Sequence, residues 1–164
     1  MSWHHVIRRL ELMWKGITIA ARIDPFVEEV LQLIPNDTII TWRIQKKGIT
    51  YSYSVRKKGL QFTQESELLN DVNHITFHTD SPHALHQVLT ARLPLANVLA
   101  SKVIKACGSS SIIMALVQVN RLSSPYMYGM RRARIVFPHI LQPLNYPKRR
   151  FIYLVRFLTA KGAS

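Results

Sequence analysis

The residues from Thr38 to Thr63 constrain the fold more than any other part of the chain. Between Ile49 and Val55, apolar or aromatic residues alternate with Thr and Ser, which is the period of a strand buried on one face. Two short basic segments that end in glycine, at 46–48 and 56–59, separate this stretch from similar ones on either side. The pattern predicts three consecutive antiparallel strands joined by tight turns, with the basic residues of both turns in solvent.

Helical patterns lie on both sides of these strands. Apolar residues recur at helical spacing from Val6 to Arg22, and Asp24-Pro25 then has the form of a capped helix start. The following segments predict a strand, two helices, a strand and a helix, at 73–79, 82–92, 95–101, 103–107 and 109–122. Asp80-Ser81 is predicted to cap the helix that begins at Pro82. This order indicates a mixed α/β (α+β) chain with five strands.

The last of these helices has an unusual composition. The run Ile112–Val117 is apolar nearly all round the expected helix, which is typical of a helix that is deeply buried or lines an apolar cavity. It is also the longest strongly apolar run, and it is far shorter than the roughly 18 residues of a membrane span. We expect neither a transmembrane helix nor a secretory signal.

The chain divides by composition at Ser123-Ser124-Pro125. Its 164 residues are typical of one domain, and beyond this point basic and aromatic residues are interleaved. We expect an α/β domain over 1–122, including the N-terminal helix, and a basic-aromatic extension over 123–164.

The distribution of charge indicates the kind of partner. The net charge is +13, and all nine acidic residues lie within residues 1–80. Residues 81–164 contain twelve Lys and Arg and no acid. We expect this half to face an anionic partner, either a membrane surface, nucleic acid or an acidic protein.

Residues that could carry catalysis are few. His74, His78, His83 and His86 cluster around a predicted strand-to-helix turn, but their spacing matches no standard metal site. Cys107 precedes a helix start, yet its apolar neighbours favour a buried, inert thiol. No nucleophile elbow, phosphate loop or zinc motif is present. We therefore expect no enzyme, no cofactor and no metal, and we keep catalysis by Cys107 or the histidines as a third hypothesis.

The basic-aromatic extension permits more than one interpretation. Cations interleaved with rings are typical of single-stranded nucleic-acid binding, and also of docking on an anionic membrane. A third interpretation places the rings in the core and the cations in water. The residues expected to meet an anionic surface are Arg131, Arg132, Arg134, Lys148, Arg149, Arg150 and Arg156.

The order of predicted elements from Thr38 to Leu122 resembles a known family. The best stretch reads ITFHTDSPHALHQVLTARLPLANVLASKVIKACGSSSIIMAL, from Ile75 to Leu116. The order of its elements is similar to that of the sterol carrier protein 2 family. These elements are a strand, an acidic turn at Asp80-Ser81, a small-residue helix, a Lys-containing strand, a turn at Gly108 and an apolar helix. The sequence departs from that pattern where Ala106-Cys107 lengthens the approach to Gly108 and where Ser109 replaces an acid.

The resemblance implies a five-stranded, mainly antiparallel sheet with helices on one face, enclosing an apolar tunnel for a lipid. Some similar bacterial proteins are accessory factors of ubiquinone biosynthesis that hold polyprenylated intermediates for biosynthetic enzymes. The implied tunnel-lining residues are Ile75, Phe77, Val98, Ile104, Ile113 and Leu116.

These observations lead to one principal expectation and one alternative. The first is a non-catalytic carrier of a lipid or polyprenyl chain, cytoplasmic and peripherally bound to anionic membranes through its basic half. The alternative is a nucleic-acid-binding module that uses the same basic-aromatic region, with steeply salt-dependent affinity.

Overall fold

A five-stranded sheet forms the base of the molecule. The computed structural model describes residues 3–65 and 73–160, so the last four residues of the expected extension lie outside the described part. The sheet has the strand order β3-β2-β1-β4-β5. Its strands are β1 (Ile39–Lys46), β2 (Ile49–Lys58), β3 (Gln61–Glu65), β4 (His74–Thr79) and β5 (Lys105–Cys107).

The strand pairing confirms the predicted meander and the mixed sheet. The pairs β1–β2, β2–β3 and β4–β5 are antiparallel. In contrast, β4 runs parallel to β1, with Trp42 opposite Phe77. The sheet is therefore mainly antiparallel, as expected, with one parallel pair at its centre.

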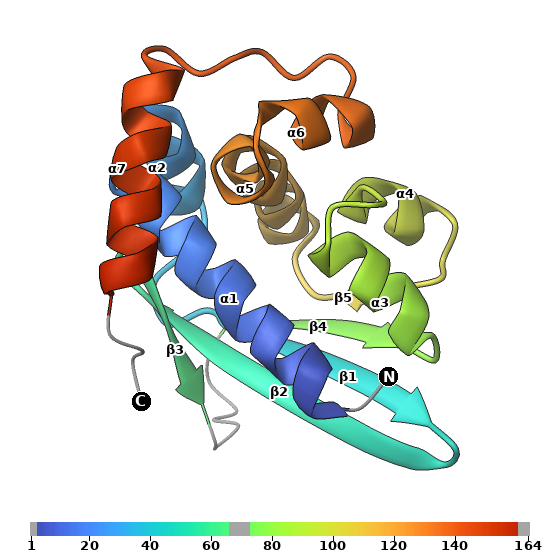
Figure 1. Cartoon of the computed structure of the whole chain (residues 1–164). Coiled ribbons are helices and arrows are strands. Elements are labelled where there is room, and N and C mark those ends of the chain that lie inside the picture. Colours follow the sequence, from blue (N-terminus) through green and yellow to red (C-terminus); the bar gives the residue numbers. More distant parts are fainter. Residues whose placement is uncertain (1–2, 66–72, 161–164) are drawn as a thin grey trace.

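The described helices gather on one face of this sheet (Figure 1). Along β1 the side chains of Ile40, Trp42 and Ile44 are buried beneath the helices, whereas Arg43 is exposed. The alternation follows from the strand's two-residue period, which sends successive side chains to opposite faces. The core thus lies between the sheet and the helices.

The first two helices are joined by an acidic cap. Helix α1 (Trp3–Ala21) crosses the sheet and buries residues such as Leu10 and Ile17. Helix α2 (Pro25–Gln32) begins with the predicted cap, since the Asp24 side chain accepts a 3.0 Å hydrogen bond from the Phe26 amide. Asp24 is itself buried.

Two short helices follow β4. Helix α3 (Pro82–Leu89) is capped by Ser81, whose side chain accepts from the Ala84 amide, as the sequence predicted. This helix ends three residues earlier than expected, and α4 (Leu95–Ala100) follows it. The fifth strand is also shorter than predicted, because β5 begins only at Lys105.

The long helix α5 differs from the expectation in length and in exposure. It runs from Ser110 to Tyr128 and includes Pro125, where the sequence predicted an end at Leu122. The Ser124 hydroxyl donates a 2.7 Å hydrogen bond to the Arg121 carbonyl, the acceptor that a proline at position 125 leaves without its amide partner. Nor is the helix buried all round, because Met114 is 57% exposed.

The chain closes with helices α6 (Met130–Val136) and α7 (Tyr146–Thr159). Helix α7 lies beside α1, with Tyr153 buried between the helices. The hydroxyl of Tyr153 would lie 2.9 Å from a Cβ added at Gly16, so the glycine permits this close approach. The extension thus contributes to the core.

The prediction that Arg56 and Lys57 lie in an exposed turn was wrong. Strand β2 continues to Lys58, and both side chains are buried. Arg56 forms ion pairs with Glu65 at 2.6 Å and Asp37 at 3.7 Å. Lys57 Nζ donates to Asn36 Oδ1 at 3.2 Å, and burial lowers the pKa of its ammonium group.

Candidate functional site

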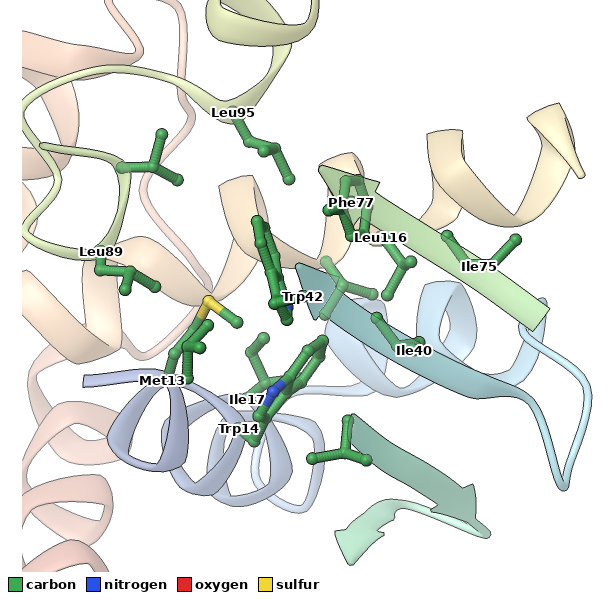
Figure 2. Close-up of a cluster of buried hydrophobic side chains, with 14 of the residues drawn as sticks. Met13, Trp14, Ile17, Ile40, Trp42, Ile75, Phe77, Leu89, Leu95 and Leu116 are labelled. Atoms are coloured by element: carbon green, nitrogen blue, oxygen red, sulfur yellow. The ribbon is translucent and has the colours of Figure 1, made fainter. Parts of the chain in front are cut away.

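The interior holds a small cavity between the sheet and the helices. Its volume is about 10 Å³. Elements α1, β1, β4, α3, α4 and α5 all contribute to its wall (Figure 2). The lining residues are Met13, Trp14, Ile17, Trp42, Phe77, Val88, Leu95, Leu116 and Asn120.

Aromatic rings form much of this wall. Trp42 and Phe77 stack with their centroids 4.4 Å apart and their planes at 19°, as neighbours on β1 and β4. Trp14 packs against Phe62 of β3, also with centroids 4.4 Å apart. The strand register and the position of α1 therefore bring these rings together, although they lie far apart in the sequence.

The open tunnel that the resemblance implied is absent from the described structure. Ligand pockets commonly have volumes of about 300–1,000 Å³, far above the 10 Å³ found between sheet and helices. Large side chains, including Trp42 and Phe77, fill the interior. Any ligand of this site must therefore separate the helices from the sheet.

The predicted lining residues occupy different positions relative to the cavity. Phe77 and Leu116 line it. Ile75, Val98 and Ile104 are buried in the surrounding core, and Ile113 is partly buried against that core. All six thus belong to the interior, but four of them do not border the present cavity.

Sequence reasoning missed most of the lining residues. Met13, Trp14 and Ile17 come from α1, which the resemblance did not cover. Trp42 comes from β1, where alternation with exposed Arg43 was the available signal for an inward position. An inward-facing tryptophan in each of two elements was the clue that could have located the site.

The wall of the cavity is almost free of polar groups. Of the lining residues only Asn120 has a polar side chain other than the two indoles, and its Nδ2 has Met13 Sδ at 4.0 Å. The Nε1 atoms of Trp14 and Trp42 are buried without a hydrogen-bond partner in the described structure. No lining residue carries a formal charge, so the site suits an uncharged, mainly apolar ligand.

The seven predicted surface cations fall into two groups. Three are held by the fold: Arg149 lies 3.4 Å from buried Asp24, Arg132 donates to the Ala91 carbonyl, and Arg150 donates to the carbonyls of Pro125 and Tyr126. The other four are Arg131, Arg134, Lys148 and Arg156, and they are exposed, as Arg132 also is.

Most rings of the basic-aromatic segment are turned inward. Tyr126 and Tyr153 are buried. The hydroxyl of Tyr146 donates to the Pro125 carbonyl at 2.9 Å, and that of Tyr128 to the Leu89 carbonyl at 3.0 Å. Phe151 is the exception, at 68% exposed. The structure therefore supports the interpretation in which the rings complete the core.

Within residues 3–65 and 73–160, the histidines and the cysteine belong to no group of three potential metal ligands. His74 Nε2 lies 2.8 Å from Thr41 Oγ1, and His78 lies 3.4 Å from Asp80. Cys107 is exposed, which corrects the prediction of a buried thiol.

No helix of the described chain is long and apolar enough to cross a membrane.

The order of strands, the single layer of helices and the apolar interior define a class: this is the sterol carrier protein 2 fold. In particular, the chain is similar to a solved UbiJ-SCP2 ubiquinone synthesis protein, with a TM-score of 0.50 and 16% sequence identity. The match covers 76% of this chain and 96% of that protein. It confirms the resemblance of the sequence at the level of the fold.

Two insect proteins are also similar in structure. The sterol carrier protein domain 2 of Helicoverpa armigera has a TM-score of 0.44 and 17% identity, over 59% of this chain and 75% of that one. Sterol carrier protein 2 like 2 of Aedes aegypti has a TM-score of 0.40 and 19% identity, over 62% and 93%. No family model and no curated protein matches the sequence.

Proposed function

We propose that this protein is a non-catalytic carrier that holds the apolar chain of a lipid or isoprenoid between its sheet and its helices. The observation that carries the proposal is the uncharged, aromatic-walled cavity at the centre of a sterol carrier protein 2 fold. The proposed chain contacts are the six residues named from the sequence, of which Phe77 and Leu116 border the cavity already.

The absence of titratable groups from the cavity wall supports a holding role. None of the nine lining residues can donate or accept a proton near neutral pH. A bound chain would therefore be sheltered from water and left chemically unchanged. The similarity to a ubiquinone synthesis protein leads us to propose polyprenylated intermediates as ligands, presented to biosynthetic enzymes in the cytoplasm.

Ligand content tests this proposal directly. Gently purified protein is examined by native mass spectrometry and then extracted with organic solvent. We expect a bound lipid, up to one per chain, and uptake of added farnesol by protein from which the lipid has been removed. Protein that contains no lipid and takes up no farnesol would rule out the carrier function.

We further propose that the protein docks on anionic membranes through its C-terminal helices. The exposed cations Arg131, Arg134, Lys148 and Arg156 accompany large exposed apolar side chains in the same part of the chain. These apolar residues are Ile135, Leu141, Leu144, Phe151, Leu154, Val155 and Leu158. Cations beside exposed apolar groups are typical of surfaces that settle into a headgroup layer.

Helix α7 shows the arrangement most clearly. Phe151, Leu154, Val155 and Leu158 are spaced by three or four residues, so they share one side of the helix. Tyr153 faces the core from the opposite side. The outward side is therefore apolar, although a surface helix usually presents polar residues there.

Vesicle binding tests the docking proposal. We expect cosedimentation with vesicles containing phosphatidylglycerol and little with phosphatidylcholine alone. Arg131→Glu with Arg134→Glu should weaken binding at least tenfold, because each cation near an anionic surface contributes about 1 kcal/mol. The matched control is Lys47→Glu with Lys58→Glu, at the exposed turn between β1 and β2 and at the exposed end of β2. Equal losses in both double variants would exclude a localised docking surface.

Nucleic-acid binding remains the second candidate because the same cations would serve it. Its support is weaker, since single-strand binding uses exposed rings for base stacking and only Phe151 among the large exposed apolar residues of α7 is aromatic. Steeply salt-dependent binding to single-stranded RNA, tighter than binding to anionic vesicles, would favour it over membrane docking.

A further inference from the structure

Three residues that line the internal cavity carry side-chain N–H donors for which the described structure shows no oxygen acceptor. Trp14 Nε1 and Trp42 Nε1 are buried and have no partner in the described structure. Asn120 Nδ2 reaches only Met13 Sδ, at 4.0 Å, and a thioether sulfur is a weak acceptor. A buried N–H without an acceptor loses its hydration and gains nothing in return, so such groups are rare in folded proteins.

The residues that carry these donors come from separate elements and lie around one cavity. Trp14 lies on α1, Trp42 on β1 and Asn120 on α5, and all three line the same cavity. Figure 2 shows the two indole rings within one cluster, between Met13 and Ile17 of α1 and Phe77 of β4. Packing alone does not require indoles here, since a phenylalanine ring would also bury apolar surface without an orphaned donor.

We propose that the buried end of the ligand carries an uncharged acceptor oxygen, and that Trp14 and Trp42 donate hydrogen bonds to it. Asn120 supplies a third donor. An indole N–H can only donate, which selects a carbonyl, ether or hydroxyl oxygen as its partner. The cavity wall holds no cation to neutralise a carboxylate or phosphate, which excludes an ionised end. This inference rests on the proposed carrier function.

The size of the cavity is consistent with a site that is closed when empty. A volume of about 10 Å³ is at the lower limit for one water molecule. A ligand's oxygen would enter as the helices separate from the sheet, and the donors would then gain the acceptor they lack. The hydrogen bonds form only with ligand present, so they favour the open, loaded state.

A matched pair of probes tests the inference on the unmodified protein. The probes are 2-tridecanone, which has one acceptor oxygen, and tridecane, which has none. Protein labelled with ¹⁵N at tryptophan gives three indole N–H signals. We expect 2-tridecanone to shift the signals of Trp14 and Trp42 downfield, as hydrogen bonding does. Tridecane should cause no downfield shift of these signals. Trp3, which packs against Tyr51 with centroids 5.0 Å apart, is the internal control.

Substitutions then separate the hydrogen bonds from the apolar contacts. Trp14→Phe and Trp42→Phe each keep an aromatic ring and remove the N–H. Each should weaken binding of 2-tridecanone about fivefold and leave the affinity for tridecane within about twofold. The inference would be overturned if both variants kept the wild-type preference for 2-tridecanone over tridecane and the wild type showed no downfield shift. The carrier function would still stand. Failure of the wild type to bind either probe would overturn both.

Discussion

The hydroxyl of Tyr126 donates a 2.6 Å hydrogen bond to the carboxylate of Asp24, 102 residues away in the sequence. Both side chains are buried, and Arg149 of α7 lies 3.4 Å from the second carboxylate oxygen. Asp24 thereby joins the start of α2 to the far end of α5 and to the last helix. Burial and this hydrogen bond raise the pKa of the Tyr126 hydroxyl above its ordinary value.

We expect Tyr126→Phe to lower the free energy of unfolding by about 2 kcal/mol, because the lost hydrogen bond has a charged acceptor. Tyr128→Phe is the matched control on the same helix, since its hydroxyl donates to the neutral Leu89 carbonyl. That variant should lose about 1 kcal/mol. Urea denaturation measures the free energy of unfolding of both variants. Equal losses would show that the charged acceptor makes this hydrogen bond no stronger than the one to the Leu89 carbonyl.

Gly108 should resist substitution. Its φ is +125°, and an added Cβ would lie 2.5 Å from Ile75 Cδ1 and 2.6 Å from the His74 carbonyl oxygen. We expect Gly108→Ala to cost about 2–5 kcal/mol, from backbone strain and from the collision with β4.

Gly59→Ala provides the comparison for this effect. Gly59 also has a positive φ, of +57°, but nothing lies within 4 Å of its added Cβ. Its alanine variant should lose only about 1 kcal/mol. Similar urea midpoints for the two variants would mean that the collision at Gly108 is relieved by movement of β4.

Stability should fall on acidification, in part through His74. Burial and then Arg43 lower the pKa of this histidine below its ordinary value of about 6.5. The unfolded chain therefore takes up the proton more readily than the folded chain, so stability is lost as the pH falls through about 6.5 toward the lower folded-state value.

His74→Gln should reduce this pH dependence, measured as the difference in unfolding free energy between pH 8 and pH 5.5. Some dependence should remain, because burial and then Arg9 also lower the pKa of His86. A pH dependence as steep as that of the wild type would show that His74 is readily protonated in the folded state.

The outward side of α7 should contribute to membrane binding without contributing to stability. Phe151 is 68% exposed and Leu158 is 81% exposed, so Phe151→Ser with Leu158→Ser should leave the urea midpoint nearly unchanged. Affinity for phosphatidylglycerol vesicles should fall about tenfold or more, because partial burial of two large apolar side chains is lost.

Met114→Ser is the matched control for this surface. Met114 is 57% exposed and lies on α5, away from the proposed membrane contact in the sequence. It should change vesicle binding by less than about twofold. Comparable weakening by the α5 and α7 substitutions would place the membrane contact elsewhere.

The elements predicted best from sequence are those specified by local chemistry. The alternation around Tyr53 and the caps at Asp24 and Ser81 depend on residues within a few positions, so their patterns can be seen directly. The end of α5 was missed because Ser124 compensates locally for Pro125. The burial of Arg56 was missed because its ion-pair partner Glu65 comes from the neighbouring strand.

The internal site shows the same limit. Phe77 and Leu116 were expected within it, since they lie on the apolar sides of a predicted strand and helix. Trp14 was not expected in the site, because its approach to Trp42 depends on how α1 crosses the sheet. The division of the basic residues also needed the structure, since Arg149 and Arg131 look alike in the sequence but only Arg149 faces a buried carboxylate.

The sequence by itself determined the number and order of the strands, the helix caps, the apolar character of the interior and the excess of cations in the second half. These properties follow from periodicity and composition, which act over short distances along the chain. Only the tertiary structure decided that the interior is closed, which cations are exposed, and that Trp14, Trp42 and Asn120 share one cavity. Those features arise from contacts between residues far apart in sequence, and no local pattern encodes them.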